Sequence, residues 1–138
     1  MKKKSLLTII TIFTLILSMS LSACAKKPDT LEGFVKTNPD VQEQINSAAV
    51  DENMFVEIKG NDISFTYDLS NAAGASADSL KDATVQEGLQ KLIEDSADRF
   101  KTICKEIEST SGLSGINLTI SFVYEGETIA TKTFSADE

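Results

Sequence analysis

A cysteine at position 24 closes the apolar N-terminal segment in a context suited to modification of its thiol. The chain begins with Met and three lysines, continues with an apolar run over residues 6–21, and then reads Leu21-Ser22-Ala23-Cys24. A basic start, an apolar centre and small residues before a cut are the parts of a secretory signal. An ordinary cleavage site also has a small residue at −3, where this chain has Leu21. The pattern is that of a lipobox, and it predicts cleavage between Ala23 and Cys24 and lipidation of the Cys24 thiol.

The predicted lipid would fix where the domain works. Two acyl chains hold a protein stably at a membrane, whereas one chain gives only reversible binding. The apolar run contains several Thr and Ser and falls short of the roughly 20 apolar residues that span a bilayer. An uncleaved anchor helix and a plain secreted protein are the alternatives. We expect a lipoprotein at the extracytoplasmic face of the cell membrane, with residues 1–23 as signal peptide, 24–30 as lipidated cysteine and tether, and 31–138 as one domain.

Charge and composition exclude several classes of partner and chemistry. The 138-residue chain has 13 basic and 21 acidic residues, and cleavage would remove three lysines and no acids, leaving a formal charge of −11. Such a domain repels phosphate backbones, so we expect no nucleic-acid partner. The chain has no histidine, which removes the usual general base and the commonest metal ligand. With Cys24 lipidated, Cys104 has no partner for a disulfide.

Cys104 is the one other thiol that could act as a nucleophile. It lies between Phe100 and Ile107 on an apolar stripe at helical spacing, and no histidine is present to activate it. A buried structural cysteine is the better interpretation. We expect no cofactor and no catalytic residue.

Three acidic clusters have the residue types of a cation site: 51–53, 61–62, and Asp95 with Asp98. None has the spacing of a calcium-binding loop, and carboxylates on helices are normally solvated. The sequence therefore predicts no metal site.

Helical periodicity and capping residues place the helices that surround these positions. Residues 30–36 predict a short helical turn. Asn38 and Pro39 predict the start of a second helix, with Asn38 as N-cap, that runs to about Val50. Apolar residues at three- and four-residue steps predict one long helix over residues 79–111.

The first hairpin is the best-specified element. Residues 54–59 and 62–69 flank Gly60-Asn61, a two-residue turn of the primed type. That loop length sets the register: Ile58 opposite Ile63, Val56 opposite Phe65, and Met54 opposite Tyr67.

The second hairpin leaves its register open. Residues 116–124 alternate apolar and polar, and Glu125-Gly126 turns the chain into 127–134. A two-residue loop places Ile129 opposite Phe122 but leaves Phe134 on the polar face. A bulge would correct this, and both arrangements remain open.

These elements predict an α+β fold of αββ-αββ order, a four-stranded antiparallel sheet with helices packed on one face. The other face would be rich in hydroxyls, and it is the candidate binding face. Its polar residues are Ser64, Thr66, Asn117, Thr119, Ser121, Thr128 and Lys132, with Phe55 and Val123 as apolar points. Ordinary solvated sheet is the alternative, because exposed strands favour Thr in any case. The loop at 71–77 is a second candidate.

Three segments resemble a known family. They are residues 31–35 (LEGFV), 38–45 (NPDVQEQI) and 56–61 (VEIKGN). The domain is similar to the small uncharacterised lipoproteins of Gram-positive bacteria grouped as domain of unknown function 4854. The resemblance implies a membrane-anchored extracytoplasmic protein and no assigned activity.

We therefore expect a non-enzymatic, lipid-tethered binding domain with a protein partner at the membrane surface. The alternative is a small-ligand or cation-binding lipoprotein that serves a membrane transporter. A carboxylate-based hydrolase is the third hypothesis, and it requires two acids that converge in a cleft.

Overall fold

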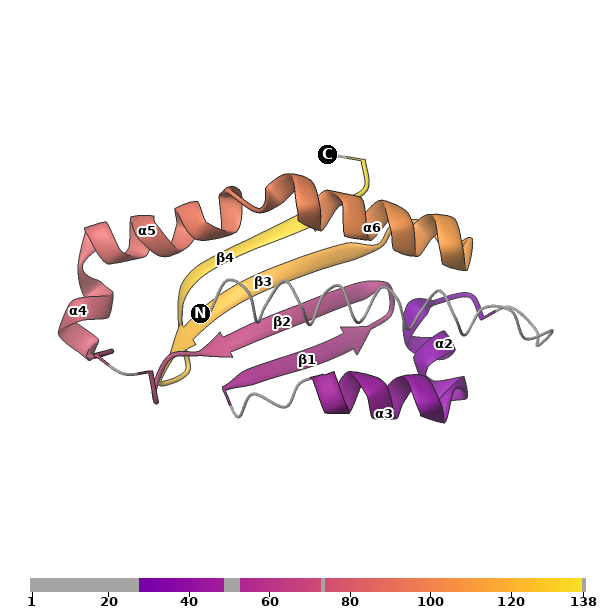
Figure 1. Cartoon of the computed structure of the whole chain (residues 1–138), viewed down its shortest axis with the longest axis horizontal. Coiled ribbons are helices and arrows are strands. Elements are labelled where there is room, and N and C mark those ends of the chain that lie inside the picture. Colours follow the sequence, from indigo (N-terminus) through magenta and orange to yellow (C-terminus); the bar gives the residue numbers. More distant parts are fainter. Residues whose placement is uncertain (1–27, 49–52, 73, 138) are drawn as a thin grey trace.

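The centre of the fold is a four-stranded sheet in the order β1-β2-β3-β4 (Figure 1). We describe a computed structural model, in which residues 28–48, 53–72 and 74–137 are defined. The strands are β1 (Met54–Lys59), β2 (Asp62–Asp68), β3 (Asn117–Tyr124) and β4 (Glu127–Ser135). The α+β class and the placement of helices on one face are confirmed.

The sheet is mixed, so the prediction of a fully antiparallel sheet is wrong. The two hairpins are antiparallel, but β2 and β3 are parallel, with Asp62 opposite Asn117 and Asp68 opposite Val123. The reason lies in the connection between them. The helices that follow β2 carry the chain back to the end at which β2 began, and a strand that starts there must run parallel to β2.

The first hairpin has the predicted register, with Ile58 opposite Ile63 and Val56 opposite Phe65. Gly60 has a φ of 61°, the positive value that the first central position of a type II′ turn requires.

A bulge in the second hairpin decides which side chains reach the core. Glu125 and Gly126 both have positive φ, as a type I′ turn requires. Phe122 lies opposite Ala130 and Val123 opposite Thr128, so Ile129 is the extra residue. Of the two registers left open, the bulged one is correct. Every later residue of β4 changes face as a result.

The first two helices meet at Asn38. Helix α2 (Leu31–Thr37) begins at Thr30, whose hydroxyl accepts a hydrogen bond from the Gly33 N–H at 3.1 Å. Helix α3 (Pro39–Ala48) follows, as predicted. The Asn38 carbonyl accepts from the N–H groups of Val41 and Gln42 in the first turn of α3. The Asn38 side chain bonds to α2. Its amide donates to the Phe34 carbonyl at 2.7 Å and so satisfies the end of α2.

The predicted long helix is three helices, α4 (Ala77–Lys81), α5 (Ala83–Glu94) and α6 (Ala97–Ser111). Ser76 caps α4, and the Asp82 carboxylate accepts from the Thr84 N–H at 2.8 Å and so caps α5. These short polar side chains bind nearby backbone groups and thereby interrupt a continuous helix. The third helix ends at Gly112, which is left-handed with a φ of 66°.

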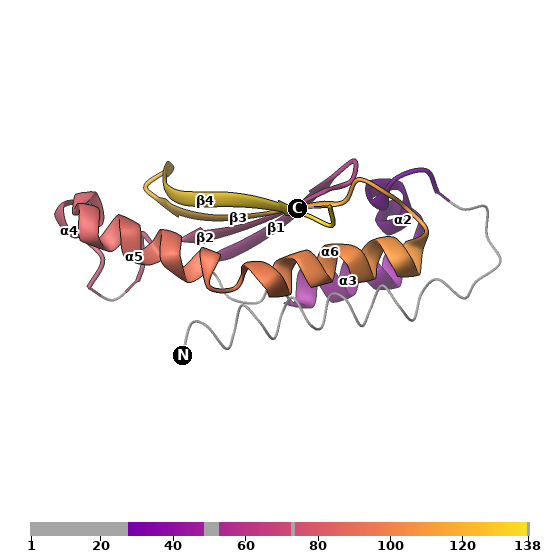
Figure 2. The ribbon, with the colours of Figure 1, turned by 90° about the horizontal axis from the view of Figure 1, so that it is seen from above.

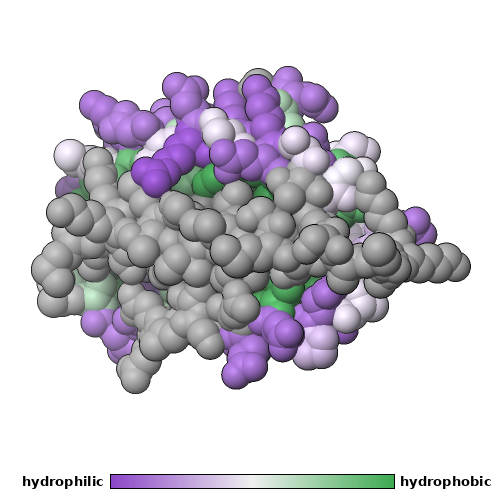
Figure 3. Space-filling view, turned by 45° about the vertical axis from the view of Figure 1, so that its right-hand side comes forward, coloured by the Kyte–Doolittle hydropathy of each residue, from purple (hydrophilic) through white to green (hydrophobic). Residues whose placement is uncertain are grey.

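The helices and the inner side of the sheet enclose the core. Figure 2 shows α3, α5 and α6 on the same side of the sheet. The Phe100 ring on α6 packs against Phe134 with centroids 5.1 Å apart, and Tyr67 packs against Phe122 at 5.8 Å. In Figure 3 the visible surface over α5 and α6 is mostly hydrophilic, as expected for helices that bury only one side.

Asn61 holds one end of the sheet together. Its side-chain oxygen accepts from the Leu31 N–H at 2.9 Å, and its side-chain nitrogen donates to the Ser114 carbonyl at 3.0 Å. The Glu32 carboxylate accepts from the Gly60 N–H at 2.7 Å, and the Glu32 N–H donates to the Gly60 carbonyl at 2.9 Å. These bonds join α2, the first hairpin turn and the loop after α6, and we call them the Asn61 clasp.

Candidate functional site

The outer side of the sheet carries no helix of the described chain (Figure 2). We call this side the open face. Alternation along each strand assigns its residues. They are Phe55, Glu57 and Lys59 of β1; Asp62, Ser64, Thr66 and Asp68 of β2; Asn117, Thr119, Ser121 and Val123 of β3; and Thr128, Thr131, Thr133 and Ser135 of β4.

Hydroxyl pairs join β3 to β4 on the open face. Thr119 and Thr133 lie directly opposite each other with their oxygens 2.8 Å apart, and Ser121 and Thr131 are likewise 2.8 Å apart. Each pair uses one hydroxyl proton internally. The other proton and the remaining lone pairs can bond outward, either to water or to a bound partner. These pairs also stabilise the hairpin, as cross-strand Thr pairs do.

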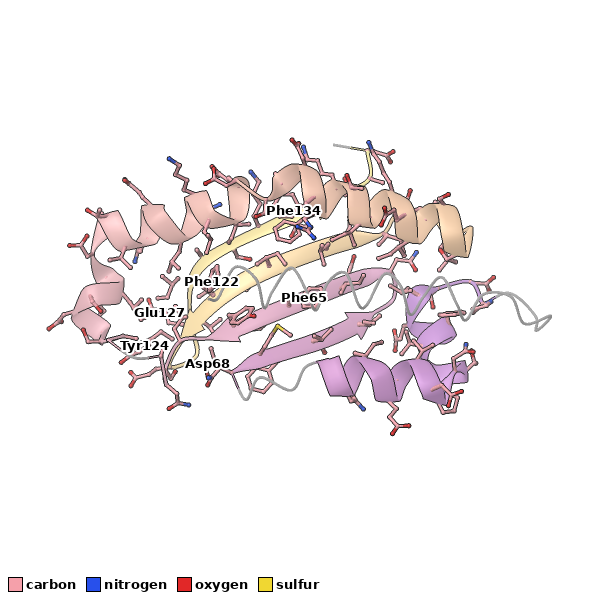
Figure 4. The ribbon with its side chains drawn as sticks, viewed as in Figure 1. Phe65, Asp68, Phe122, Tyr124, Glu127 and Phe134 are labelled. Atoms are coloured by element: carbon pink, nitrogen blue, oxygen red, sulfur yellow. The ribbon has the colours of Figure 1, made fainter. Side chains whose placement is uncertain are left out.

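Acidic side chains mark the two ends of this face. At the Asn61 end, the Asn117 amide donates to the Asp62 carboxylate at 2.8 Å. At the other end, Asp68 accepts from the Ser70 N–H at 2.9 Å and from its hydroxyl, and these bonds lower the pKa of Asp68. Figure 4 places Asp68 beside Tyr124 and Glu127 at this end of the strands. Carboxylates at both ends disfavour an anionic partner.

Phe55 is the prominent apolar residue of the open face. It is 57% exposed, which is the largest exposure of any large hydrophobic residue in the described chain. It lies opposite Thr66 at the β1 edge. A solvent-exposed aromatic side chain beside polar groups is a common feature of interaction surfaces.

Lys132 does not belong to the candidate face, and its assignment to that face is wrong. It lies opposite Ile120, on the helix side of the sheet. There its ammonium is 3.6 Å from the Glu94 carboxylate and 5.8 Å from the centre of the Phe134 ring. The bulge at Ile129 causes the change, because it moves every later residue of β4 to the opposite face.

The structure brings the other six predicted polar residues together. Ser64, Thr66, Asn117, Thr119 and Ser121 lie on the open face on the two central strands, and Thr128 lies on the same face in β4.

The bulge also brings in two residues that sequence reasoning missed, Thr131 and Thr133. The available signal was Phe134: a large aromatic residue is expected in the core, and only a bulged register buries it.

Cys104 is a structural residue. It is fully buried on α6, and its thiol faces the Phe134 carbonyl at 3.7 Å. Burial, aided by the Glu108 carboxylate, raises the pKa of the thiol to about 11. At neutral pH the group is therefore protonated and unreactive, as the sequence predicted.

Other candidate chemistry is limited in the parts of the chain that the structure describes. There, no three His, Cys, Asp or Glu residues converge as a metal-binding group would. No described helix is long and apolar enough to cross a membrane. The lipidation and cleavage residues Cys24 and Ala23 and the acidic pair at 51–52 lie outside the described residues.

The site thus defined is a flat polar surface on a mixed α+β sheet, held on a rigid core. It offers paired hydroxyls, one exposed aromatic residue and acidic ends, which are groups that can donate and accept hydrogen bonds and make apolar contacts.

Comparison with known families assigns the chain to one family. The model of a family described as a domain of unknown function (DUF4854) matches residues 31–134, and the chain belongs to this family. No curated protein and no solved structure matches. Two of the segments that carry the resemblance, 31–35 and 56–61, meet in the Asn61 clasp. Their residues therefore have a structural role, since they fasten the first helix to the sheet.

Proposed function

We propose that the protein is a lipoprotein anchored through Cys24 at the extracytoplasmic face of the cell membrane. We further propose that its domain is a non-enzymatic binding module that engages a membrane-surface partner with the open face. The observation that carries the binding role is the exposure of Phe55 on the same side of the sheet as the hydroxyl pairs, on a face that no described helix covers. A module of this kind is a rigid scaffold with one chemically distinct surface.

The anchor rests on the lipobox and on the short tether after it. Residues 25–30 span about 20 Å when extended, at roughly 3.3–3.6 Å per residue. A domain on such a tether stays close to the membrane, so its partner must reach or reside at that surface.

Acyl labelling tests the anchor, and the second cysteine supplies a matched control. Cells producing the full chain are fed an alkynyl fatty acid, and incorporation is compared between Cys24→Ala and Cys104→Ala. We expect Cys24→Ala to lose the label and to keep residues 1–23, while Cys104→Ala remains labelled and cleaved. Equal labelling of the two variants would contradict the proposal.

Site-specific photocrosslinking tests the binding face. A photoreactive residue replaces Thr133 on the open face or, as control, Thr102, which is exposed on α6. We expect a crosslinked product in intact membranes from position 133 only, and at least a severalfold loss of it when Phe55→Ser is added. Identical products from both positions, or none from position 133, would refute a role for this face.

A further inference from the structure

The two edges of the sheet are protected very differently. An edge strand presents unpaired backbone groups to other chains, and proteins shield such edges with bulges, inward-facing charges or covering elements. The β4 edge has all three: the bulge at Ile129, the inward-facing Lys132 paired with Glu94, and α5 and α6 packed against the strand.

The β1 edge lacks a bulge and an inward-facing charge. Its register with β2 is unbroken from Met54 to Lys59, and the strand contains no proline. It also carries apolar residues on both faces of the sheet. Phe55 is 57% exposed on the open face, and Val56 and Ile58 are only partly buried on the helix side. Three incompletely buried apolar residues thus lie on this one edge strand.

The hydrogen-bond pattern identifies which backbone groups face outward. Lys59 and Asp62 close the hairpin, and at the other end the Asn53 carbonyl accepts from the Asp68 N–H at 2.7 Å. Bonding alternates along an antiparallel pair. The residues between these two positions that bond to β2 are therefore Phe55 and Glu57, and the backbone groups of Met54, Val56 and Ile58 point away from the sheet.

We propose that β1 pairs antiparallel with β1 of a second copy of this chain, which joins two four-stranded sheets into one. In this dimer Val56 lies opposite the partner's Val56, and Met54 lies opposite the partner's Ile58. Each such pair exchanges both of its N–H···O bonds, so the outward groups of both strands are satisfied. On the helix side these pairs extend the apolar core across the edge. The dimer does not require the open face to bind anything.

Backbone bonding and charge disfavour two neighbouring registers. A shift of one residue would set outward-facing backbone groups against groups already bonded to β2. A shift of two residues toward the turn would place Glu57 opposite the partner's Glu57, and like charges directly opposite each other are destabilising. In the proposed register Glu57 lies opposite the partner's Phe55, which its methylene groups would cover.

A second copy suits the edge better than an unrelated strand. With a two-fold axis at Val56, the strand pairs with an identical strand, and the apolar residue Met54 near one end lies opposite the apolar residue Ile58 near the other. One acid and one base, Glu57 and Lys59, leave the strand itself neutral within an acidic chain. Because the rest of the molecule repels its copy, the dimer should strengthen as salt rises.

Cysteine crosslinking in membranes containing the full chain tests the proposal. Opposed bonded residues have Cα atoms about 5.5 Å apart, within the range a disulfide spans. We expect Val56→Cys to form a disulfide-linked species of twice the chain mass under mild oxidation. The parent chain and Thr131→Cys, which lies beside the protected β4 edge, should remain monomeric. Absence of the doubled species, or equal crosslinking of Thr131→Cys, would overturn the proposal.

Edge-blocking variants supply a second readout that does not depend on oxidation. Val56→Pro removes an outward N–H that no bond to β2 uses, and Val56→Lys imitates the inward-facing Lys132 of the other edge. Sedimentation of the full chain in detergent should show a dimer whose dissociation constant rises at least about tenfold in each variant. The melting temperature of the monomer identifies a variant that has failed to fold.

A dimer that persists in both folded variants would refute pairing through β1. A Val56→Cys product containing a different protein would show that another chain occupies the edge, and it would overturn the second-copy assignment. Open-face crosslinking from position 133 is independent of both results, so the two proposals fail separately.

Discussion

Single side chains fasten this fold at places where backbone pairing ends. Asn61 bonds to α2 on one side and to the loop before β3 on the other, through both atoms of one amide. The Asn117 N–H also donates to the Asn61 carbonyl at 3.1 Å. A single residue thereby links three segments that are far apart in the sequence.

Asn61→Ala should lower the free energy of unfolding by about 1–3 kcal/mol, because the Leu31 N–H and the Ser114 carbonyl lose their partners. Asn61→Asp should be intermediate, since it keeps the acceptor and loses the donor. Urea denaturation measures the change. The control is Asn46→Ala on the exposed side of α3, which should stay within about 0.5 kcal/mol of wild type.

Cys104 should make stability depend on pH in the alkaline range. Its pKa is raised to about 11 in the folded chain, so the folded state holds the thiol proton more tightly than the unfolded state. The stabilisation is therefore complete below 9.0, the ordinary pKa of the thiol, and is lost as pH rises toward 11. We expect the stability difference between wild type and Cys104→Ala to shrink over this window. A difference that stays constant from pH 8 to 11 would contradict this, and lysine titration cancels because both chains share it.

At the scale of elements, the bulge in β4 is the decisive feature. One extra residue, Ile129, turns Phe134 into the core and Thr131 and Thr133 outward, and it moves Lys132 beside Glu94. The hydroxyl pairs of the open face exist only in this register.

Two phenylalanines on opposite faces test that register. Phe134→Ala should cost about 3–5 kcal/mol, because the side chain is fully buried against Phe100. Phe55→Ala should cost less than about 0.5 kcal/mol, because Phe55 is 57% exposed. Thermal and urea unfolding measure both. Equal losses would mean that β4 is not bulged.

Most of the secondary structure and strand pairing was predictable from the sequence, and the exceptions have physical causes. Turn length fixed the first hairpin register, because two-residue loops allow one pairing. The breaks between α4, α5 and α6, at Asp82 and Ser96, were not predicted, because the apolar spacing continues across both positions. The parallel pairing of β2 with β3 was not predictable from hairpin signals, since it depends on where the helical connection returns the chain.

For the whole molecule, packing is uneven along the helix layer. Four apolar residues of α6 (Phe100, Ile103, Cys104 and Ile107) are buried, whereas the fully described α4 and α5 bury Leu80 and Ile93, and Val85 is 36% exposed. Figure 1 shows α4 beyond the end of the strands. We expect α4 and the start of α5 to open locally more readily than the rest.

Hydrogen exchange should reveal this gradient. Amides of α4 and of the first turns of α5 should exchange at least about 100-fold faster than those of α6 and of the central strands β2 and β3, because few apolar contacts hold them. Peptide-resolved mass spectrometry of the full chain measures the rates. Uniform protection across α4–α6 would show that the three helices open as one unit.

The sequence by itself determined the four strands, the first register and the location of a hydroxyl-rich face, because turn chemistry and the alternation of side chains are local properties. It also supplied the lipobox on which the proposed anchor rests. Only the tertiary structure decided that β2 and β3 are parallel, that a bulge buries Phe134, that the long apolar stripe is divided among three helices, and that β1 is an edge strand with neither a bulge nor an inward-facing charge. The strand pairing, the bulge and the edge depend on contacts between residues far apart in the chain, and local preference cannot specify which of two allowed faces or neighbours a strand will take.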